Sequence, residues 1–238
     1  MATEKGKREV IVTGVAEVDE KLGGGIPLGS LCLVEGHSDA GKSVLCQHLA
    51  SGTLTSGDTS VAYYTTENSV RSLISQMDSL SLFVLDHFLA DNLRVYPLTF
   101  SSYVQDGRQP FFVLTRHISQ LLKRFKLVIV DSITLLVTHS DPVAIIDFFS
   151  QCKNLCAADR SIILVAHSYA FEEDMLSRTR SLCDARFRLR LEQVGDRMVK
   201  LMEVLKVRGA DRPTGDIVSF DIEPGLGMRI IPLAKARV

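Results

Sequence analysis

Tryptophan, a long apolar run and an excess of charge of either sign are all absent from this 238-residue sequence. No apolar stretch approaches the roughly 18 residues that a membrane-spanning helix needs, and residues 1–7 contain no apolar segment of the kind found in signal peptides. We therefore expect no direct insertion into a membrane. The 27 basic and 28 acidic residues leave a net charge of −1, so the chain lacks the overall basic field that drives binding to nucleic acid.

Cysteine is scarce, and its pattern excludes two kinds of site. An odd number of cysteines without C-x-x-C spacing argues against a disulfide framework or a zinc knuckle. We interpret the five thiols as small buried hydrophobic groups in a reducing compartment. They are Cys32, Cys46, Cys152, Cys156 and Cys183.

What the chain does contain is a regular alternation of strand and helix signals. Hydrophobic residues make up 46% of the sequence, which suits one α/β domain over residues 1–238. Strands followed by helices imply a mainly parallel central sheet flanked by helices, with right-handed crossovers. Periodicity predicts strands at 30–35, 61–64, 93–96, 127–130 and 161–165, a short edge strand at 8–12, and helices at 15–22, 44–54, 69–80, 111–124 and 142–158.

Two further segments show other patterns. Residues 185–191 alternate apolar and basic side chains, the period-2 pattern of a half-buried strand, and strand-like segments follow at 197–207, 217–222 and 228–231. We expect these C-terminal strands to be antiparallel and to extend one edge of the sheet. Residues 98–109 read as an exposed loop, and the helix after it would present a broad apolar face that includes Phe112 and Leu122.

A glycine-rich loop is the most specific motif in the sequence. Residues 36–43 read G-x-x-x-x-G-K-S between an apolar strand and a helix, which is the order that a phosphate-binding loop requires. Backbone N–H groups and the helix N-terminus would cradle the phosphates of ATP, with Lys42 as a point charge and catalytic group, and Ser43 on Mg²⁺. The predicted nucleotide-binding residues are Gly36, His37, Ser38, Asp39, Ala40, Gly41, Lys42, Ser43 and Val44.

Two carboxylates are expected near that loop. Asp131 ends the strand at 127–130 and would share Mg²⁺ with Ser43 at the same edge of the sheet. The next residue is Ser132, whereas many phosphate-loop ATPases have a water-activating glutamate there. A general base would then come from another strand, and Glu67 is the candidate; the alternative is a capping or solvated glutamate.

Three more residues are candidates for contacts with the γ-phosphate. His167 follows the strand at 161–165 and could sense that phosphate. Lys206 and Arg208 end a predicted strand and point the same way, so they could act on the nucleotide of a neighbouring subunit; the alternative is a solvated strand end. The six histidines show no metal-binding spacing, so no metal other than Mg²⁺ is indicated.

Together these motifs resemble the RecA superfamily of phosphate-loop NTPases, and within it the KaiC-like single-domain ATPases. The resemblance rests on residues 14–19, on the run 22–30 that leads into the glycine loop, and on residues 206–209. It covers nearly the whole chain. It implies a RecA-like core.

More narrowly, the chain is similar to the nucleotide-binding accessory proteins of the archaellum motor. The similarity lies in residues 41–47, 65–68 and 130–132. It implies ATP binding with weak or absent hydrolysis, a hexameric ring, and a cytoplasmic position at the inner face of the membrane. It also implies partners: the motor ATPase, the cytoplasmic ring proteins and the membrane platform protein. Residues 37–40 depart from the small residues common in relatives, and Asp39 would repel phosphate unless it faces solvent.

Three functional hypotheses remain open from sequence. In the first, ATP binding regulates assembly with the motor. The second is a DNA-acting, recombinase-like ATPase; the segment 168–174 is acidic where its basic channel loop should lie, and its support is the cluster Arg178, Arg180, Arg186, Arg188 and Arg190. The third is a KaiC-like signalling ATPase that phosphorylates itself.

Overall fold

A computed structural model describes residues 9–57, 59–99, 108–194 and 196–231, and a nine-stranded sheet runs through this part of the chain. The strand order is β11-β10-β9-β8-β3-β7-β6-β4-β5. The parallel part consists of β3 (Leu31–Gly36), β4 (Ser60–Thr65), β5 (Leu93–Pro97), β6 (Phe125–Asp131) and β7 (Ser161–His167). The predicted parallel α/β core is therefore confirmed.

The C-terminal strands extend the sheet beyond β3. Strand β8 (Ala185–Val194) pairs in parallel with β3, and β9 (Arg197–Val207), β10 (Ile217–Glu223) and β11 (Gly227–Ile230) follow as antiparallel neighbours. The expected antiparallel extension is confirmed for β9 to β11, but β8 still runs in the direction of the parallel core.

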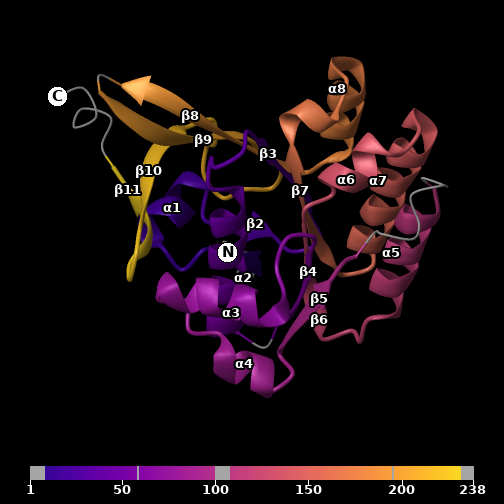
Figure 1. Ribbon diagram of the computed structural model, residues 1–238, viewed down its shortest axis with the longest axis horizontal. Helices are drawn as coiled ribbons and strands as arrows, with labels where there is room; N and C mark the ends of the chain where they lie inside the picture. The colour runs from indigo at the N-terminus through magenta and orange to yellow at the C-terminus, as the bar shows by residue number, and fades with distance from the viewer. Residues whose placement is uncertain (1–8, 58, 100–107, 195, 232–238) are drawn as a thin grey trace, which may run out of the picture.

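Helices cover both faces of this sheet (Figure 1). The indigo-to-magenta part of the chain supplies α1 (Ala16–Lys21), α2 (Lys42–Ser56), α3 (Val70–Ser79) and α4 (Leu85–Leu89) to one face. The other face carries α5 (Arg108–Gln120), α6 (Thr134–Thr138), α7 (Pro142–Ala157) and α8 (Glu173–Leu182). A 3₁₀ turn, η1 (Ser168–Ala170), joins β7 to α8.

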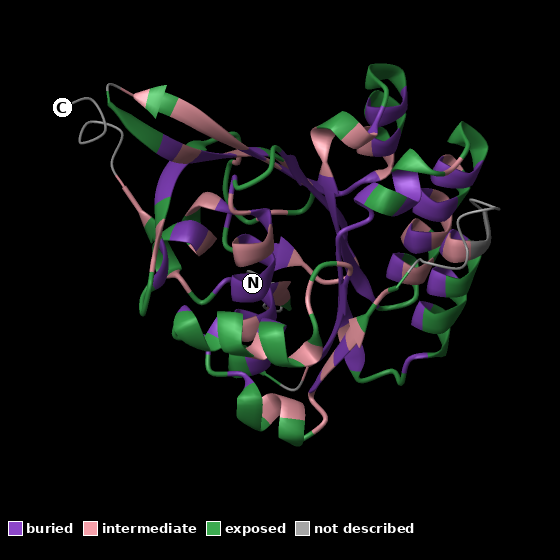
Figure 2. Ribbon diagram, in the orientation of Figure 1, coloured by how far each residue is buried: buried purple, intermediate pink, exposed green. Residues whose placement is uncertain are grey.

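The period of two along each strand divides the core into two layers. In β3, Cys32 and Val34 pack in the layer with α2, while Leu31 and Leu33 pack in the layer with α7. Strands covered on both faces read as continuous apolar runs, which is why the sequence identified them. Figure 2 shows these strands as buried ribbons between the two helical layers.

Several elements differ from the sequence prediction. Helix α5 ends at Gln120, and Phe112 and Leu122 are 59% and 54% exposed rather than part of its apolar face. The buried residues Phe111, Leu114 and Ile118 follow helical spacing, which places Phe112 on the solvent side, and Leu122 lies beyond the last turn. The elements α4, α6, η1 and α8 were not predicted.

The predictions for residues 8–12 and 98–109 fare differently. Strand β1 (Val10–Ile11) pairs with β2 (Ile26–Pro27) in a separate two-stranded sheet, so it is not an edge of the main sheet. Most of the predicted loop, residues 100–107, lies outside the described residues.

All five cysteines are buried, as predicted. In the described residues, no helix has the length and apolar character needed to span a membrane.

Candidate functional site

The carboxyl ends of the parallel strands bring the predicted site residues together. Gly36 at the end of β3 is the register partner of His167 at the end of β7. Asp131 at the end of β6 is the partner of Thr65, two residues before Glu67. In open α/β sheets this edge is where ligands bind.

The two loop glycines are required by neighbouring backbone and side chains. A Cβ on Gly36 would lie 2.0 Å from the carbonyl oxygen of Leu189 on β8. Gly41 has φ +93°, and its Cβ would lie 3.1 Å from the ring of Phe220 on β10. The loop geometry is thus set by contacts with the C-terminal strands as well as by the loop itself.

Helix α2 begins where the loop ends, and its first turn is open to a ligand. Gly41 occupies the N-cap position, and no side chain of the described residues caps the helix. The first backbone N–H groups of a helix have no partner within the helix, and its dipole favours an anion there. Lys42 is 6% exposed, and its Nζ donates to the carbonyl oxygen of His37 at 2.5 Å. Burial lowers the pKa of Lys42, and the charges of Asp131 and Glu67 oppose that shift.

Asp131 is held by the hydroxyl group of Tyr63 at this edge. The Tyr63 hydroxyl donates to Asp131 Oδ2 at 2.8 Å. Burial raises the pKa of the Asp131 carboxyl, and the hydrogen bonds from Tyr63 and Ser43 oppose the rise. The peptide bond between Asp131 and Ser132 is cis, and the Ser132 N–H donates to Thr66 Oγ1 at 3.1 Å.

The donor set suits a hard cation bound mainly through oxygen. Ser43 begins α2 just after the glycine loop and Asp131 ends β6, so a hydroxyl and a carboxylate meet at this edge of the sheet, and Ser43 opposes the rise in the pKa of Asp131. The described residues contain no group of three or more His, Cys, Asp or Glu side chains placed to hold a metal. Magnesium commonly takes only one or two protein ligands, with water and phosphate oxygens completing its shell, so this pair fits the predicted ion.

Glu67 and Asp39 both lie near enough for their charges to act on Lys42 and on His167. Glu67 and Asp39 are exposed, whereas His167 is partly buried. Burial and the Lys42 charge lower the pKa of His167, and the charges of Glu67 and Asp39 oppose that shift. Exposure of Asp39 lets its carboxylate face solvent, although its charge is still felt at Lys42.

Lys206 and Arg208 lie at the opposite edge of the sheet. Lys206 pairs with Arg186 near the start of β8, and Arg186 pairs with Leu33, three residues before Gly36, so Lys206 lies roughly 10 Å short of the glycine loop along the strand direction. Within the chain, Lys206 Nζ donates to the carbonyl oxygen of Cys183 at 2.7 Å. Arg208 lies 3.5 Å from Asp184. The structure does not bring these two cations to the chain's own loop.

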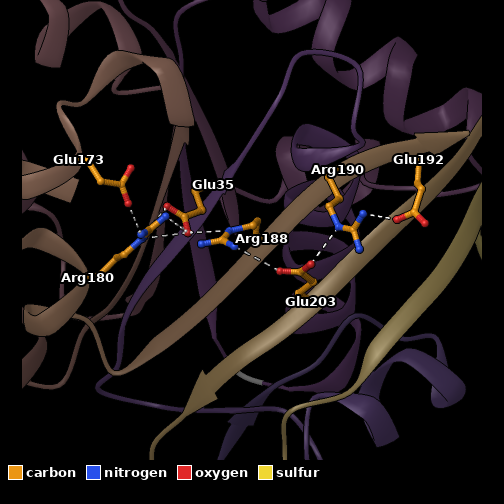
Figure 3. A network of polar contacts seen from close by, with 7 residues as sticks. All are labelled: Glu35, Glu173, Arg180, Arg188, Arg190, Glu192 and Glu203. Carbon is orange, nitrogen blue, oxygen red and sulfur yellow. Dashed lines mark hydrogen bonds and ion pairs between the residues drawn. The ribbon is translucent and has the colours of Figure 1, made fainter. Parts of the chain in front are cut away.

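Three arginines of the cluster, Arg180, Arg188 and Arg190, belong to one ion-pair network (Figure 3). Glu35, the residue before Gly36, has a side chain only 1% exposed and lies 2.9 Å from Arg180 and 3.5 Å from Arg188. Arg188 and Arg190 also reach Glu203, at 3.6 and 2.9 Å. Arg180 comes from α8 and Glu35 from β3, so the network joins these two elements and engages its three arginines within the chain.

Sequence reasoning missed three residues at the site. Tyr63 contacts Asp131, and Thr134 contacts His167. Tyr169 stacks on the His167 ring with centroids 5.1 Å apart. The sequence did contain a signal for Tyr63. It lies two residues before Thr65, so the alternation of side chains along a strand places both on the same face of β4. Nothing in the local pattern marked Thr134.

The family model and the individual relatives that match this chain agree on one family. The family described as ATPase: KaiC matches residues 11–235. The chain is 28% identical over 229 residues to the archaeal flagellar ATP-binding protein FlaH of Sulfolobus acidocaldarius, covering 96% of this chain and 99% of that protein. It is 30% identical over 218 residues to FlaH of Methanocaldococcus jannaschii, covering 90% and 91%.

Solved structures show the same similarity. The crystal structure of the flagellar accessory protein FlaH from Methanocaldococcus jannaschii superposes with a TM-score of 0.84 at 27% identity, covering 94% of this chain and all of that one. A KaiC-like protein from Pyrococcus horikoshii superposes with a TM-score of 0.76 at 15% identity over 95% of this chain and all of that one, which shows the shared fold.

Proposed function

The chain belongs to the KaiC family of ATPases and, within it, to the FlaH archaeal flagellar ATP-binding proteins, and we propose on this premise that it binds ATP with Mg²⁺ to regulate assembly of the archaellum motor. The supporting observation is the uncapped first turn of α2 behind the glycine loop, with Lys42 buried beside it. Residues 36–44 would hold the phosphates, and Ser43 with Asp131 would hold the ion. Magnesium bound there would neutralise phosphate charge.

Turnover is proposed to be slow or absent. Ser132 follows Asp131 and cannot act as a general base. Glu67 remains the candidate base, but its side chain is exposed, and among the described residues no hydrogen bond or ion pair fixes its orientation. ATP would then act chiefly as a structural ligand that shifts the chain toward a partner-binding form.

The assembly is proposed to be a hexameric ring in which the two edges of the sheet meet across subunits. Lys206 and Arg208 would act on a neighbour's γ-phosphate, since they lie far from their own glycine loop. The proposed partners are the motor ATPase, the cytoplasmic ring proteins and the membrane platform protein, with the ring at the cytoplasmic face of the membrane. His167 would sense the γ-phosphate.

Calorimetry with ATP and Mg²⁺ tests the central claim. The wild-type chain should bind ATP–Mg²⁺, and Lys42→Ala should weaken binding by about a hundredfold because it removes a charge-assisted contact in a buried site. Arg116→Ala, a change on the exposed face of α5, serves as the matched control and should leave the affinity unchanged. Absence of binding by the wild-type protein would refute the proposal.

A turnover assay and a DNA-binding assay separate the competing hypotheses. Fast multiple turnover without a partner would contradict the role of ATP as a structural ligand. Salt-dependent binding to single-stranded DNA, lost on Arg186→Glu and Arg188→Glu, would favour the recombinase-like alternative, although Glu35 and Glu203 already pair with Arg188. Phosphate incorporated into Ser or Thr from ATP would favour the signalling alternative.

A further inference from the structure

We propose that Thr134 is a positioning residue that fixes His167 in the tautomer with its proton on Nε2, and that this lets the site distinguish ATP from ADP. The inference rests on the proposed function, because it assigns a role to Thr134 in the same nucleotide site. Thr134 begins α6, the short helix after Asp131 and Ser132, and it is 7% exposed.

Two contacts join Thr134 to His167. The backbone N–H of His167 donates to Thr134 Oγ1 at 3.1 Å. The same Oγ1 lies 3.0 Å from His167 Nδ1. One hydroxyl group therefore holds both the backbone and the ring of the histidine.

The hydrogen-bonding capacity of these groups decides the tautomer. A threonine hydroxyl has one hydrogen to donate and accepts through its lone pairs. Oγ1 accepts from the backbone N–H of His167, and the described residues offer its hydrogen no other acceptor, so the arrangement that uses this hydrogen has Oγ1 donating to Nδ1. In a neutral imidazole one nitrogen donates and the other accepts, so an accepting Nδ1 leaves the proton on Nε2.

The surroundings keep the ring neutral and oriented. Burial and the Lys42 charge lower the pKa of His167, which favours the neutral imidazole. The charges that act on the ring come from Lys42, Glu67 and Asp39, all beside the glycine loop. Tyr169 stacks on the ring with an interplanar angle of 23°.

An Nε2–H group of His167, held in place by Thr134, would donate a hydrogen bond to the terminal phosphate of ATP. An Nε2–H group can donate to a phosphate oxygen, whereas an Nε2 lone pair would face that anion and repel it. ADP lacks the third phosphate group, so loss of the donor should weaken ATP binding and leave ADP binding nearly unchanged.

Matched variants at two threonines of α6 provide the test. Thr134→Val keeps the shape and removes the hydroxyl, Thr134→Ser keeps the hydroxyl, and Thr138→Val removes an exposed hydroxyl that bonds to Leu135. Calorimetry should show that Thr134→Val lowers the preference for ATP over ADP about three- to tenfold. Thr134→Ser and Thr138→Val should keep it within about twofold of the wild-type ratio.

A spectroscopic readout separates positioning from a structural effect. In ¹⁵N-histidine-labelled protein, with the His167 signal assigned by its loss in His167→Gln, the wild-type ring should show the Nε2–H pattern. Thr134→Val should shift that pattern and Thr134→Ser should restore it.

Three results would overturn the inference. They are an Nδ1–H tautomer in the wild-type protein, an unchanged nucleotide preference in Thr134→Val, and failure of Thr134→Ser to restore that preference. Failure of the proposed function is distinguishable, because a wild-type chain that binds neither nucleotide could still show the Nε2–H tautomer imposed by Thr134.

Discussion

At the scale of single residues, Tyr63 supports the carboxylate at the end of β6. Its hydroxyl donates to Asp131 inside the protein, so Tyr63→Phe leaves a buried acceptor with one partner fewer. We expect the free energy of unfolding to fall by about 1–3 kcal/mol, as measured by urea denaturation. Tyr64→Phe is the control: its hydroxyl meets the exposed His117, and the loss should be smaller. Equal losses in both variants would contradict this account.

His48 gives the stability of the protein a dependence on pH. It is 2% exposed on α2, and its Nε2 accepts from the backbone N–H of Met228 on β11. Burial lowers its pKa, so the unfolded chain takes up a proton below about pH 6.5 that the folded chain does not. Stability is therefore fully present above that pH and is lost as the pH falls toward the lower folded pKa.

The measurement is the slope of the unfolding free energy between pH 7 and pH 5. A single histidine contributes at most about 1.4 kcal/mol per pH unit. His48→Gln retains an acceptor for Met228 but cannot titrate, so its slope should be shallower than that of the wild type. The pKa of His167 is lowered as well, but it is present in both proteins and cancels. Parallel slopes would exclude His48 as a source of the dependence.

At the scale of elements, a buried ion pair connects α8 to β3. Glu35 and Arg180 lie 2.9 Å apart, and both side chains are largely shielded from solvent. Arg180→Met leaves Glu35 buried with Arg188 as its remaining partner, and we expect a loss of about 3 kcal/mol in unfolding free energy. The double variant with Glu35→Met removes both charges and should be less destabilised than Arg180→Met alone. An additive loss would contradict the coupling.

Elements also show where the sequence was sufficient. The strands β3, β6 and β7 were predicted because burial on both faces gives each a continuous apolar run. The glycine loop was predicted because its motif is a fixed pattern of neighbouring residues. Helix α8 was not, because Glu172, Glu173 and Asp174 read as an acidic loop while only Met175, Leu176 and Thr179 are buried. The partnership of Thr134 with His167 joins residues 33 apart in sequence, and no local pattern marks it.

At the scale of the whole molecule, Arg208 lies beside Asp184 near the start of β8, away from the glycine loop that follows the end of β3. We expect Arg208→Ala to leave the ATP affinity of an isolated chain within about twofold of wild type, since Arg208 does not reach its own glycine loop. Mass photometry with ATP–Mg²⁺ should show a hexamer for the wild type and smaller species for this variant. A variant that lost ATP binding as a monomer would contradict an action between subunits. That residues 1–238 form one domain stays a prediction.

The position of β3 has a consequence for how the chain is made. This strand carries the glycine loop, yet its hydrogen-bonding neighbours β7 and β8 begin only at Ser161 and Ala185. At about 5–20 residues per second, a nascent chain holds this apolar strand without its partners for roughly 6 to 25 seconds before β7 begins. Translation speed and chaperones that bind exposed strands should therefore govern the yield of folded protein more than its final stability does.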